Sequence, residues 1–168
     1  MAIHEILVFP DARLRKVAQA VGTIDDSIRQ LVADMFETME ANHGAGLAAN
    51  QINVQQRVVV IHDEHVQPEA FCLINPEILE RRGKQPSEEG CLSVPGFYEE
   101  VERAAWVKVR YLDLDGKEHI VESKDERAAS VFQHEFDHLD GKLYVDYLSR
   151  LKQQRIRKKL EKFLRNNM

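Results

Sequence analysis

The sequence predicts an α+β fold with mainly antiparallel strand pairing. Three observations lead to this prediction. Apolar residues recur at helical spacing in three segments, and β-branched or alternating apolar runs fill the region between the first two of them. The second helical segment also carries polar residues of the kind that perform chemistry.

The first element is a short apolar run, residues 6–9, which Pro10 ends, so it fits a strand or an extended arm. A helix is expected after residues 23–26, whose side-chain oxygens can cap it, and Gly44 lies just beyond its end. Its apolar positions are Ile28, Leu31, Val32, Met35, Phe36 and Met39.

Strands are expected where apolar runs stand between polar stretches. Residues 57–62 and 71–75 are such runs. Residues 106–112 alternate, reach the Asp-Gly turn sequence at 115–116, and are followed by a return strand at 119–122. These segments predict an antiparallel hairpin at the end of the strand region.

A second helix fits from about Asp125 to Leu139, with Gly141 placed to stop it. A third is expected from about Asp146 to the end of the chain. Its apolar side is formed by Leu148, Leu151, Ile156, Leu160, Phe163 and Leu164. No repeat or low-complexity linker divides the 168 residues, so we expect residues 1–168 to form a single domain.

The composition is that of an ordinary globular protein, with 43% hydrophobic and 30% charged residues. No apolar run approaches the ~20 residues that span a bilayer, and the N-terminus lacks the pattern of a secretory signal. Two cysteines cannot form a disulfide framework, and Cys72 has the surroundings of a core residue. We therefore expect a cytoplasmic protein with no membrane partner.

The net charge of −5 conceals an asymmetry between the two parts of the chain. Residues 147–168 contain eight basic residues and one acid, which gives +7, so residues 1–146 carry −12. An acidic body with a basic tail suggests that the two parts meet different partners. A solvated basic face is the alternative reading of the tail.

His134, Glu135 and His138 form an H-E-x-x-H pattern within the second predicted helix. Residues four apart lie on one face of a helix, so both imidazoles can reach one ion, and the glutamate can handle the proton of a water beside it. The alternative is a pair of exposed histidines next to a glutamate.

A catalytic divalent metal usually has three protein ligands and an open position for water. No histidine follows the pattern, and the acids downstream are Asp140, Asp146 and Glu161. Upstream, Cys91 lies in the segment 89–93, which reads as a glycine-containing turn with polar neighbours. This setting differs from that of a typical buried cysteine.

The segment 44–51, Gly-Ala-Gly-Leu-Ala-Ala-Asn-Gln, combines small residues with a terminal amide. It lacks the further glycine and lysine of a phosphate-binding loop. Small residues instead let the backbone approach a ligand, and Gln51 offers a neutral amide donor.

The three segments 44–51, 89–93 and 133–141 together resemble the signature motifs of peptide deformylases. The similarity covers nearly the whole chain, from Phe9 into the basic C-terminal helix. The resemblance implies antiparallel sheets around a central metal-binding helix. It also implies removal of the formyl group from the N-terminal formylmethionine of new polypeptides. The implied metal ligands are Cys91, His134 and His138.

The usual ion in the family is iron(II), which zinc, nickel or cobalt can replace, and the sequence does not choose among them. One thiolate and two neutral imidazoles leave a divalent centre with a net positive charge, which lowers the pKa of bound water. Glu135 would accept the proton and pass it to the departing amine. The resemblance assigns oxyanion stabilisation to the Gln51 side chain and the Leu92 backbone N–H.

The resemblance also implies a substrate pocket, in which this chain departs from the family pattern. The expected pocket residues are Ala45, Gly46, Glu89, Arg127, Ser130 and Val131. Ala45 replaces a bulky aliphatic residue, Arg127 a frequent leucine, Ser130 an aliphatic residue, and Glu126 a frequent glycine. We expect Arg127 either to face solvent or to lie at the pocket mouth with an acidic partner, because an unpaired buried arginine is costly.

Two other functions stay open at this point. A metallopeptidase or other metal-dependent amidase would explain the H-E-x-x-H helix but neither Cys91 nor the segment 44–51. A non-catalytic metal module that docks on RNA would explain the basic tail but not Glu135. The resemblance favours N-formylmethionyl nascent peptides as substrate and the ribosome near the tunnel exit as partner of the C-terminal helix.

Overall fold

The computed structural model describes residues 2–166, and it confirms an α+β fold with antiparallel sheets. The helices are α1 (Asp26–Ala41), α2 (Glu126–Leu139) and α3 (Arg150–Asn166). The strands are β1 (Gly46–Ala48), β2 (Val58–Ile61), β3 (Phe71–Arg82), β4 (Gln85–Cys91), β5 (Val94–Arg103), β6 (Trp106–Leu112) and β7 (Glu118–Glu122). Short 3-10 helices are η1 (Ala12–Arg15), η2 (Ala49–Ile52) and η3 (Tyr144–Tyr147).

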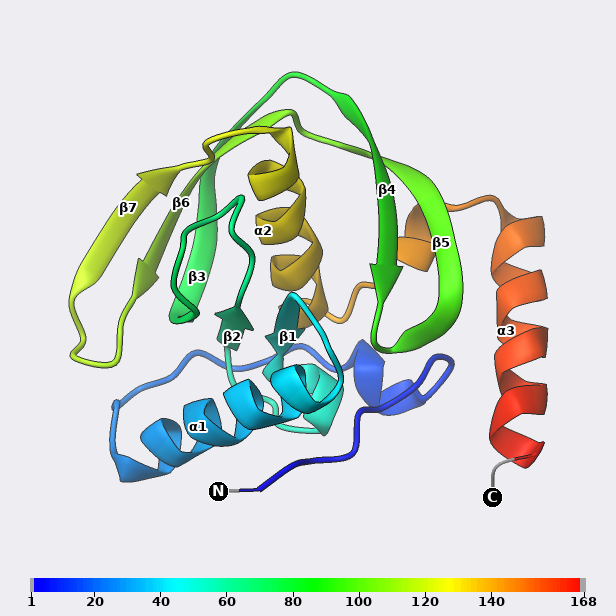
Figure 1. Cartoon of the computed structure of the whole chain (residues 1–168), viewed down its shortest axis with the longest axis horizontal. Helices are drawn as coiled ribbons and strands as arrows, with labels where there is room; N and C mark the ends of the chain where they lie inside the picture. Colours follow the sequence, from blue (N-terminus) through cyan, green and yellow to red (C-terminus); the bar gives the residue numbers. More distant parts are fainter. Residues whose placement is uncertain (1, 167–168) are drawn as a thin grey trace.

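The strands form a five-stranded sheet in the order β1-β2-β3-β6-β7 and a separate β4–β5 hairpin. Figure 1 shows α2 between the sheet and the hairpin, α1 below the sheet, and α3 on the outer side of the hairpin. Every pairing within the strands is antiparallel. The element that carries the H-E-x-x-H pattern is therefore enclosed by β structure from two sides.

Strand β2 shows why the sheet is buried on both faces here. Val59 and Ile61 pack in the cluster that includes Phe132 of α2, whereas Val58 and Val60 pack in the cluster around α1. Successive strand residues point to opposite faces, so a continuous apolar run fits a strand covered on both sides. Cys72 of β3 lies in the α1 cluster, as expected of a core residue.

A third cluster attaches the N-terminal arm and α3 to the hairpin. It includes Phe9, Val101 of β5, Tyr144 of η3, and Ile156 and Leu160 of α3. Residues 6–9 form an extended arm rather than a strand. The arm is held by backbone bonds from Leu7 N to Gln51 O and from Phe9 N to Ser93 O, both 2.8 Å.

Helix α2 begins and ends as predicted, because Asp125 caps it by accepting from Ala128 N and Gly141 follows its end at φ 75°. The third helix was expected from Asp146, but that residue lies in η3 and α3 begins at Arg150. The carboxylate of Asp146 accepts from Leu143 N and so caps the 3-10 turn instead. The expected end of this helix, residues 167–168, lies outside the described residues.

The strand predictions were wrong in two places, the extent of one strand and the absence of a hairpin. Strand β3 continues past Asn75 to Arg82, since a register shift at Pro76 absorbs the missing N–H and Asn75 adopts φ 51°. The β4–β5 hairpin was not predicted because β4 is rich in polar residues, and Cys91 ends β4 instead of lying in a turn. No helix in the described part of the chain is long and apolar enough to cross a membrane.

Candidate metal centre

Cys91, His134 and His138 bring three metal-binding atoms together. Their ligand atoms all lie within 4.8 Å of one another, and Sγ of Cys91 is 3.4 Å from Nε2 of His138. The cysteine ends β4 behind a register shift, whereas the histidines lie one turn apart on α2. The cluster thus joins the hairpin to the central helix.

The hydrogen bonds of His134 fix which of its nitrogens is free. Its Nδ1 lies 2.8 Å from Oε1 of Glu89, so Nδ1–H is donated there and Nε2 is the nitrogen that gives up its proton to bind an ion. On His138, Nε2 faces the thiol, and Nδ1 is buried without a partner among the described residues. A thiolate with two imidazoles fits iron, zinc, cobalt or nickel, and three ligands leave a position open.

The two imidazoles differ in their affinity for a proton. Burial would lower the pKa of His134, but its contacts with Cys91 and Glu89 outweigh burial and raise that pKa well above its usual value. Burial and the charge on His134 lower the pKa of His138 well below its usual value. His138 is therefore neutral and ready to donate a lone pair.

Glu89 belongs to a buried ionic network behind the cluster. Arg103 donates Nε and Nη2 to the two oxygens of Glu89 at 2.8 and 2.7 Å, and Nη1 to Oδ2 of Asp137 at 2.7 Å. Burial would raise the pKa of Glu89, but Arg103 and His134 lower it to about 2. Glu89 is therefore charged, and it orients His134 through Nδ1.

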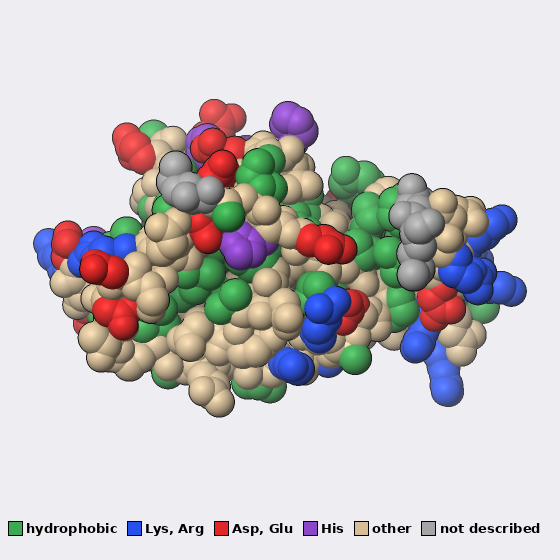
Figure 2. Space-filling view, turned by 90° about the horizontal axis from the view of Figure 1, so that it is seen from below, with side chains coloured by type: hydrophobic (Ala, Val, Ile, Leu, Met, Phe, Trp, Pro, Cys, Tyr) green, Lys and Arg blue, Asp and Glu red, His purple; other side chains and the backbone are tan. Residues whose placement is uncertain are grey.

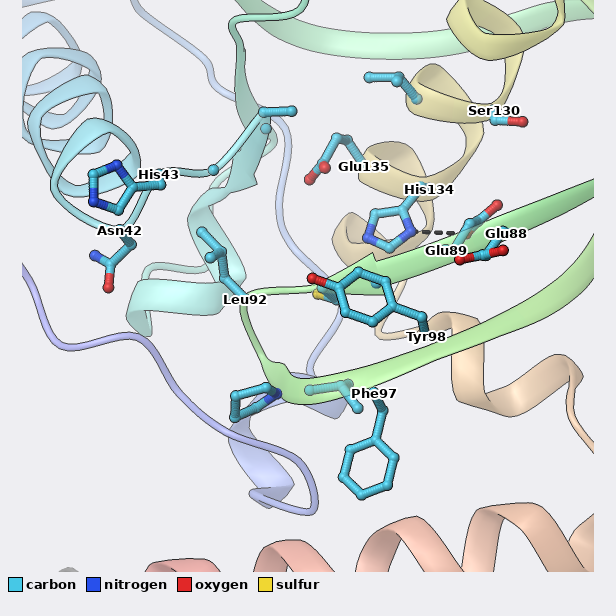
Figure 3. Close-up of a pocket in the computed structure, with 18 of the residues that line it drawn as sticks. Asn42, His43, Glu88, Glu89, Leu92, Phe97, Tyr98, Ser130, His134 and Glu135 are labelled. Carbon is cyan, nitrogen blue, oxygen red and sulfur yellow. Dashed lines mark hydrogen bonds and ion pairs between the residues drawn. The ribbon is translucent and has the colours of Figure 1, made fainter.

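Glu135 points from α2 into the pocket, as Figure 3 shows. Its side chain is buried, and no described residue hydrogen-bonds to its Oε1. Burial raises its pKa to about 7, although the charge on His134 opposes this. A Cβ on Gly46 would lie 2.5 Å from Oε2 of Glu135, so a larger residue at this position of β1 would displace the carboxyl. Glu135 is placed to exchange protons near neutral pH.

Gln51 has its amide orientation fixed by two contacts. Its Oε1 accepts from Ala48 N at 2.9 Å, so Nε2 must face the other way, where it donates to Ser93 Oγ at 3.0 Å. The same Nε2 is 3.5 Å from Sγ of Cys91. The amide donor therefore lies beside the metal-binding cluster.

A cavity of about 670 Å³ opens at this cluster. The residues that the sequence suggested are brought together here, with His138 behind the cavity wall: Ala45, Gly46, Gln51, Glu89, Cys91, Leu92, Arg127, Ser130, Val131, His134 and Glu135. The hairpin contributes Phe97 and Tyr98, and the end of α1 contributes Asn42 and His43 (Figure 3). These four residues were not singled out from the sequence.

Arg127 lies at this cavity and is half exposed, with an acidic partner. Its Nη2 and Nε are 3.0 and 3.2 Å from Oδ2 of Asp63, whose carboxylate is nearly buried. Of the two expected placements, solvent or the pocket mouth with an acidic partner, Arg127 combines features of both, because it is half exposed and paired with Asp63. Ser130 is buried on the same helix, one turn further on.

Sequence reasoning did not identify Arg103 or the partner of Gln51, Ser93. The alternation of buried and exposed residues along β5 could have identified Arg103 as buried, because Val101 and Arg103 share the buried face of the strand. A buried arginine needs carboxylate partners. The contact between Gln51 and Ser93 depends on the packing of η2 against the hairpin turn. No local sequence pattern predicts this contact.

Comparisons with known proteins agree with this geometry. The family model described as polypeptide deformylase matches residues 3–154. A peptide deformylase of Alkalilimnicola ehrlichii is 55% identical over 98% of this chain and 93% of its own length. The crystal structure of a peptide deformylase from Legionella pneumophila has a TM-score of 0.91 and 47% identity, over 98% of this chain and 97% of that one. A peptide deformylase from Ehrlichia chaffeensis in complex with actinonin also has a TM-score of 0.91, with 40% identity over 96% and 98%.

Proposed function

Because this chain belongs to the polypeptide deformylase family, we propose that the cavity beside Cys91 and Glu135 is where it removes the formyl group from N-terminal formylmethionine. One observation carries the proposal. The metal-binding atoms of Cys91, His134 and His138 lie together beside this cavity, although Cys91 comes from β4 and the histidines from α2. Oε1 of Glu135, which has no hydrogen-bond partner among the described residues, lies at the same cavity. We also propose that residues 1–168 act as a single catalytic domain.

Cys91, His134 and His138 would hold one divalent ion in this proposal. Such an ion supplies Lewis acidity, which lowers the pKa of water and polarises a carbonyl. Glu89 keeps His134 turned so that Nε2 faces the cluster. We propose iron(II), the usual ion of the family, as the physiological ion, with zinc, nickel or cobalt as substitutes that the mixed thiolate and imidazole donors also fit.

Glu135 is the proton carrier in this scheme. Its pKa of about 7 lets it accept a proton from the attacking water at neutral pH and give one up later. Water adds its oxygen to the formyl carbon, and the C–N bond then breaks. The proton from Glu135 goes to the departing amine, and formate is released.

The developing negative charge on the formyl oxygen requires donors. We propose Nε2 of Gln51 and the backbone N–H of Leu92 for this role. The amide of Gln51 is already oriented by Ala48 and Ser93, and the second N–H of Nε2, which lies 3.5 Å from Sγ of Cys91, is the one that would donate to the developing charge. Leu92 follows the ligand Cys91 directly and lines the cavity.

The test compares hydrolysis of formyl-Met-Ala with that of Met-Ala, using protein purified without oxygen and analysed for metal. Air could oxidise the cysteine thiolate and conceal activity. Release of formate from the first peptide alone supports the proposal. Cleavage of unformylated Met-Ala would instead make the protein a metallopeptidase.

Cys91→Ser tests the ligand set directly, because it exchanges a soft thiolate for a poor ligand at similar size. We expect loss of iron and of iron-supported activity. An unchanged metal content and rate would remove Cys91 from the centre. A fourth protein ligand found by metal spectroscopy would favour a structural site over a catalytic one.

We further propose that the protein works in the cytoplasm on nascent peptides and docks on the ribosome through α3. Lys and Arg side chains gather at the end of the molecule formed by α3 (Figure 2). Most residues of this helix are exposed, including Arg157, Lys158 and Lys162. A basic helix of this kind fits the phosphate backbone of RNA.

A further inference from the structure

Tyr147 lies outside the catalytic cavity but contacts two charged residues behind it, the buried Arg103 and the partly buried Asp137. Its side chain is 48% exposed, and it ends η3 just before α3. Its hydroxyl donates to Oδ2 of Asp137 at 2.8 Å, and its ring lies 5.0 Å from the guanidinium carbon of Arg103. A second cavity of about 350 Å³ reaches these three residues.

Asp137 depends on this hydroxyl for part of its hydrogen bonding. The same oxygen, Oδ2, accepts from Nη1 of Arg103 at 2.7 Å and from Tyr147 at 2.8 Å. Burial and the Asp137 carboxylate raise the pKa of Tyr147 to about 12, so the hydroxyl stays protonated and remains a donor. Without this donor, Arg103 is the one described residue whose side chain still holds the Asp137 carboxylate.

Arg103 transmits the orientation of Asp137 toward the centre. Its rigid planar guanidinium makes two bonds to Glu89 and one to Asp137, so the three contacts fix its position. Oε1 of Glu89 is shared between Nη2 of Arg103 and Nδ1 of His134. A change in the tilt of Arg103 therefore changes the acceptor of His134.

We propose that Tyr147 is a positioning residue for the metal centre, whose hydroxyl fixes Asp137 and, through Arg103 and Glu89, the ring of His134. The proposal rests on the metal site of the proposed function. In this proposal, the segment between α2 and α3 helps to position the metal centre, and this role does not depend on the basic charge of α3. The purely structural alternative is that Tyr147 only anchors η3 to α2.

Tyr147→Phe separates these roles because it keeps the ring beside Arg103 and removes only the hydroxyl. The first measurement is the rate at which the zinc-loaded protein releases its metal to a chromogenic chelator. Loss of a direct second partner of a metal ligand costs about 10–100-fold in metal affinity, so a more distant residue is expected to accelerate release by about threefold to tenfold. The control is Tyr111→Phe, which removes the hydroxyl of a β6 tyrosine packed against Phe71 and His119.

The second measurement is exchange of the Nδ1 proton of His134 with water, followed by NMR in the zinc-loaded protein. We expect faster exchange in Tyr147→Phe than in the wild type or in Tyr111→Phe. Asp137→Asn should accelerate both processes, and the double variant should add little to it, since the two residues act in sequence. Loss of an anchor alone would lower the urea midpoint and leave exchange and zinc release unchanged.

Wild-type release and exchange rates in Tyr147→Phe would overturn the positioning role. Additive effects in the double variant would do the same. Failure of the metal site itself is distinguishable, because His134→Ala would then still bind zinc as the wild type does. That result would reject the proposed centre regardless of what Tyr147 does.

Discussion

Helices α2 and α3 lie on opposite sides of the β4–β5 hairpin, and they are buried to very different degrees (Figure 1). Eleven of the fourteen residues of α2 are buried, whereas α3 buries only Ile156 and Leu160 among its seventeen. Helix α2 is enclosed by the sheet and the hairpin. Helix α3 is attached to the hairpin by one narrow row of apolar side chains.

The difference decides what charged residues can do beside α2, where they come from β4 and β5, and on α3 itself. The side chains of Arg103 and Glu89, which support α2, are 4% and 5% exposed, whereas those of Arg157 and Glu161 on α3 are 61% and 45% exposed. Charges in low dielectric interact strongly and shift each other's pKa, whereas exposed charges are screened. Chemistry is thus expected beside α2, and recognition of an external partner along α3.

The largest effect is expected for Glu135→Gln on α2. The change removes the proton acceptor but keeps the size, so turnover of formyl-Met-Ala should fall by roughly 10²–10⁴ with metal content near the wild-type level. Glu161→Gln on α3 is the matched control, and its turnover should not change. Nearly full activity of metal-loaded Glu135→Gln would refute the role of this carboxyl.

Glu89→Gln should cost about 3–5 kcal/mol of unfolding free energy, because it leaves Arg103 buried with a missing charge partner. Glu161→Gln breaks an exposed pair with Arg157 four residues away, which is worth about 0.3–0.5 kcal/mol. Urea unfolding of both metal-free variants measures the two values. Equal losses of unfolding free energy in the two variants would show that burial does not strengthen the Glu89–Arg103 pair relative to the exposed pair on α3.

The buried pair of Glu89 and Arg103 predicts that stability depends on pH. Glu89 has a pKa of about 2 in the folded protein against 4.5 ordinarily, so the folded state favours its charged form. Its contribution, about 3 kcal/mol, is present above pH 4.5 and is lost as the pH falls toward 2. Between pH 5 and pH 3, metal-free wild type should therefore lose more stability than metal-free Glu89→Gln. Parallel losses would contradict the lowered pKa.

On α3, replacement of Lys158, Lys162 and Arg165 by Gln should weaken ribosome binding and leave hydrolysis of a short formyl peptide unchanged. If each contacts one phosphate, the slope of log affinity against log salt should become shallower by about 2–3. Sedimentation with ribosomes at several salt concentrations measures this slope. Deletion of the chain after Leu148 should abolish the same component, and an unaltered affinity in both would reject docking through α3.

The two helices also differ in how well the sequence predicted them. For α2, Asp125 and Gly141 are local signals that bracket a dense apolar face, and both bounds were correct. For α3, the apolar series starts at Leu148, which packs in the same cluster as Ile156 and Leu160 but is extended, at φ −87° and ψ 163°. Periodicity alone therefore placed the start at Asp146.

The candidate site was predictable only where its residues form contiguous motifs. His134, Glu135 and His138 follow from helix geometry, and Cys91 and Gln51 from the resemblance of their segments. Arg103, Asp137 and Tyr147 meet only because β5, α2 and η3 converge. Their hydrogen-bond partners are 10 to 34 residues away in the sequence, so no local sequence pattern predicts these contacts.

The smallest effect is expected for Arg127→Leu, at the exposed end of α2. Because Asp63 already binds this guanidinium, only part of its charge is available to a substrate, and a half-exposed pair is worth about 0.2–1 kcal/mol. An acidic side chain on the first residue of the substrate peptide should therefore gain little binding free energy from Arg127. Relative to formyl-Met and formyl-Nle peptides, formyl-Glu peptides should lose about twofold to fivefold in kcat/KM in the variant, and formyl-Gln peptides less. Arg150→Leu, at the first residue of α3, is the matched control and should keep the wild-type ranking. If Arg127→Leu also ranks the four substrates as the wild type does, Arg127 has no part in substrate preference.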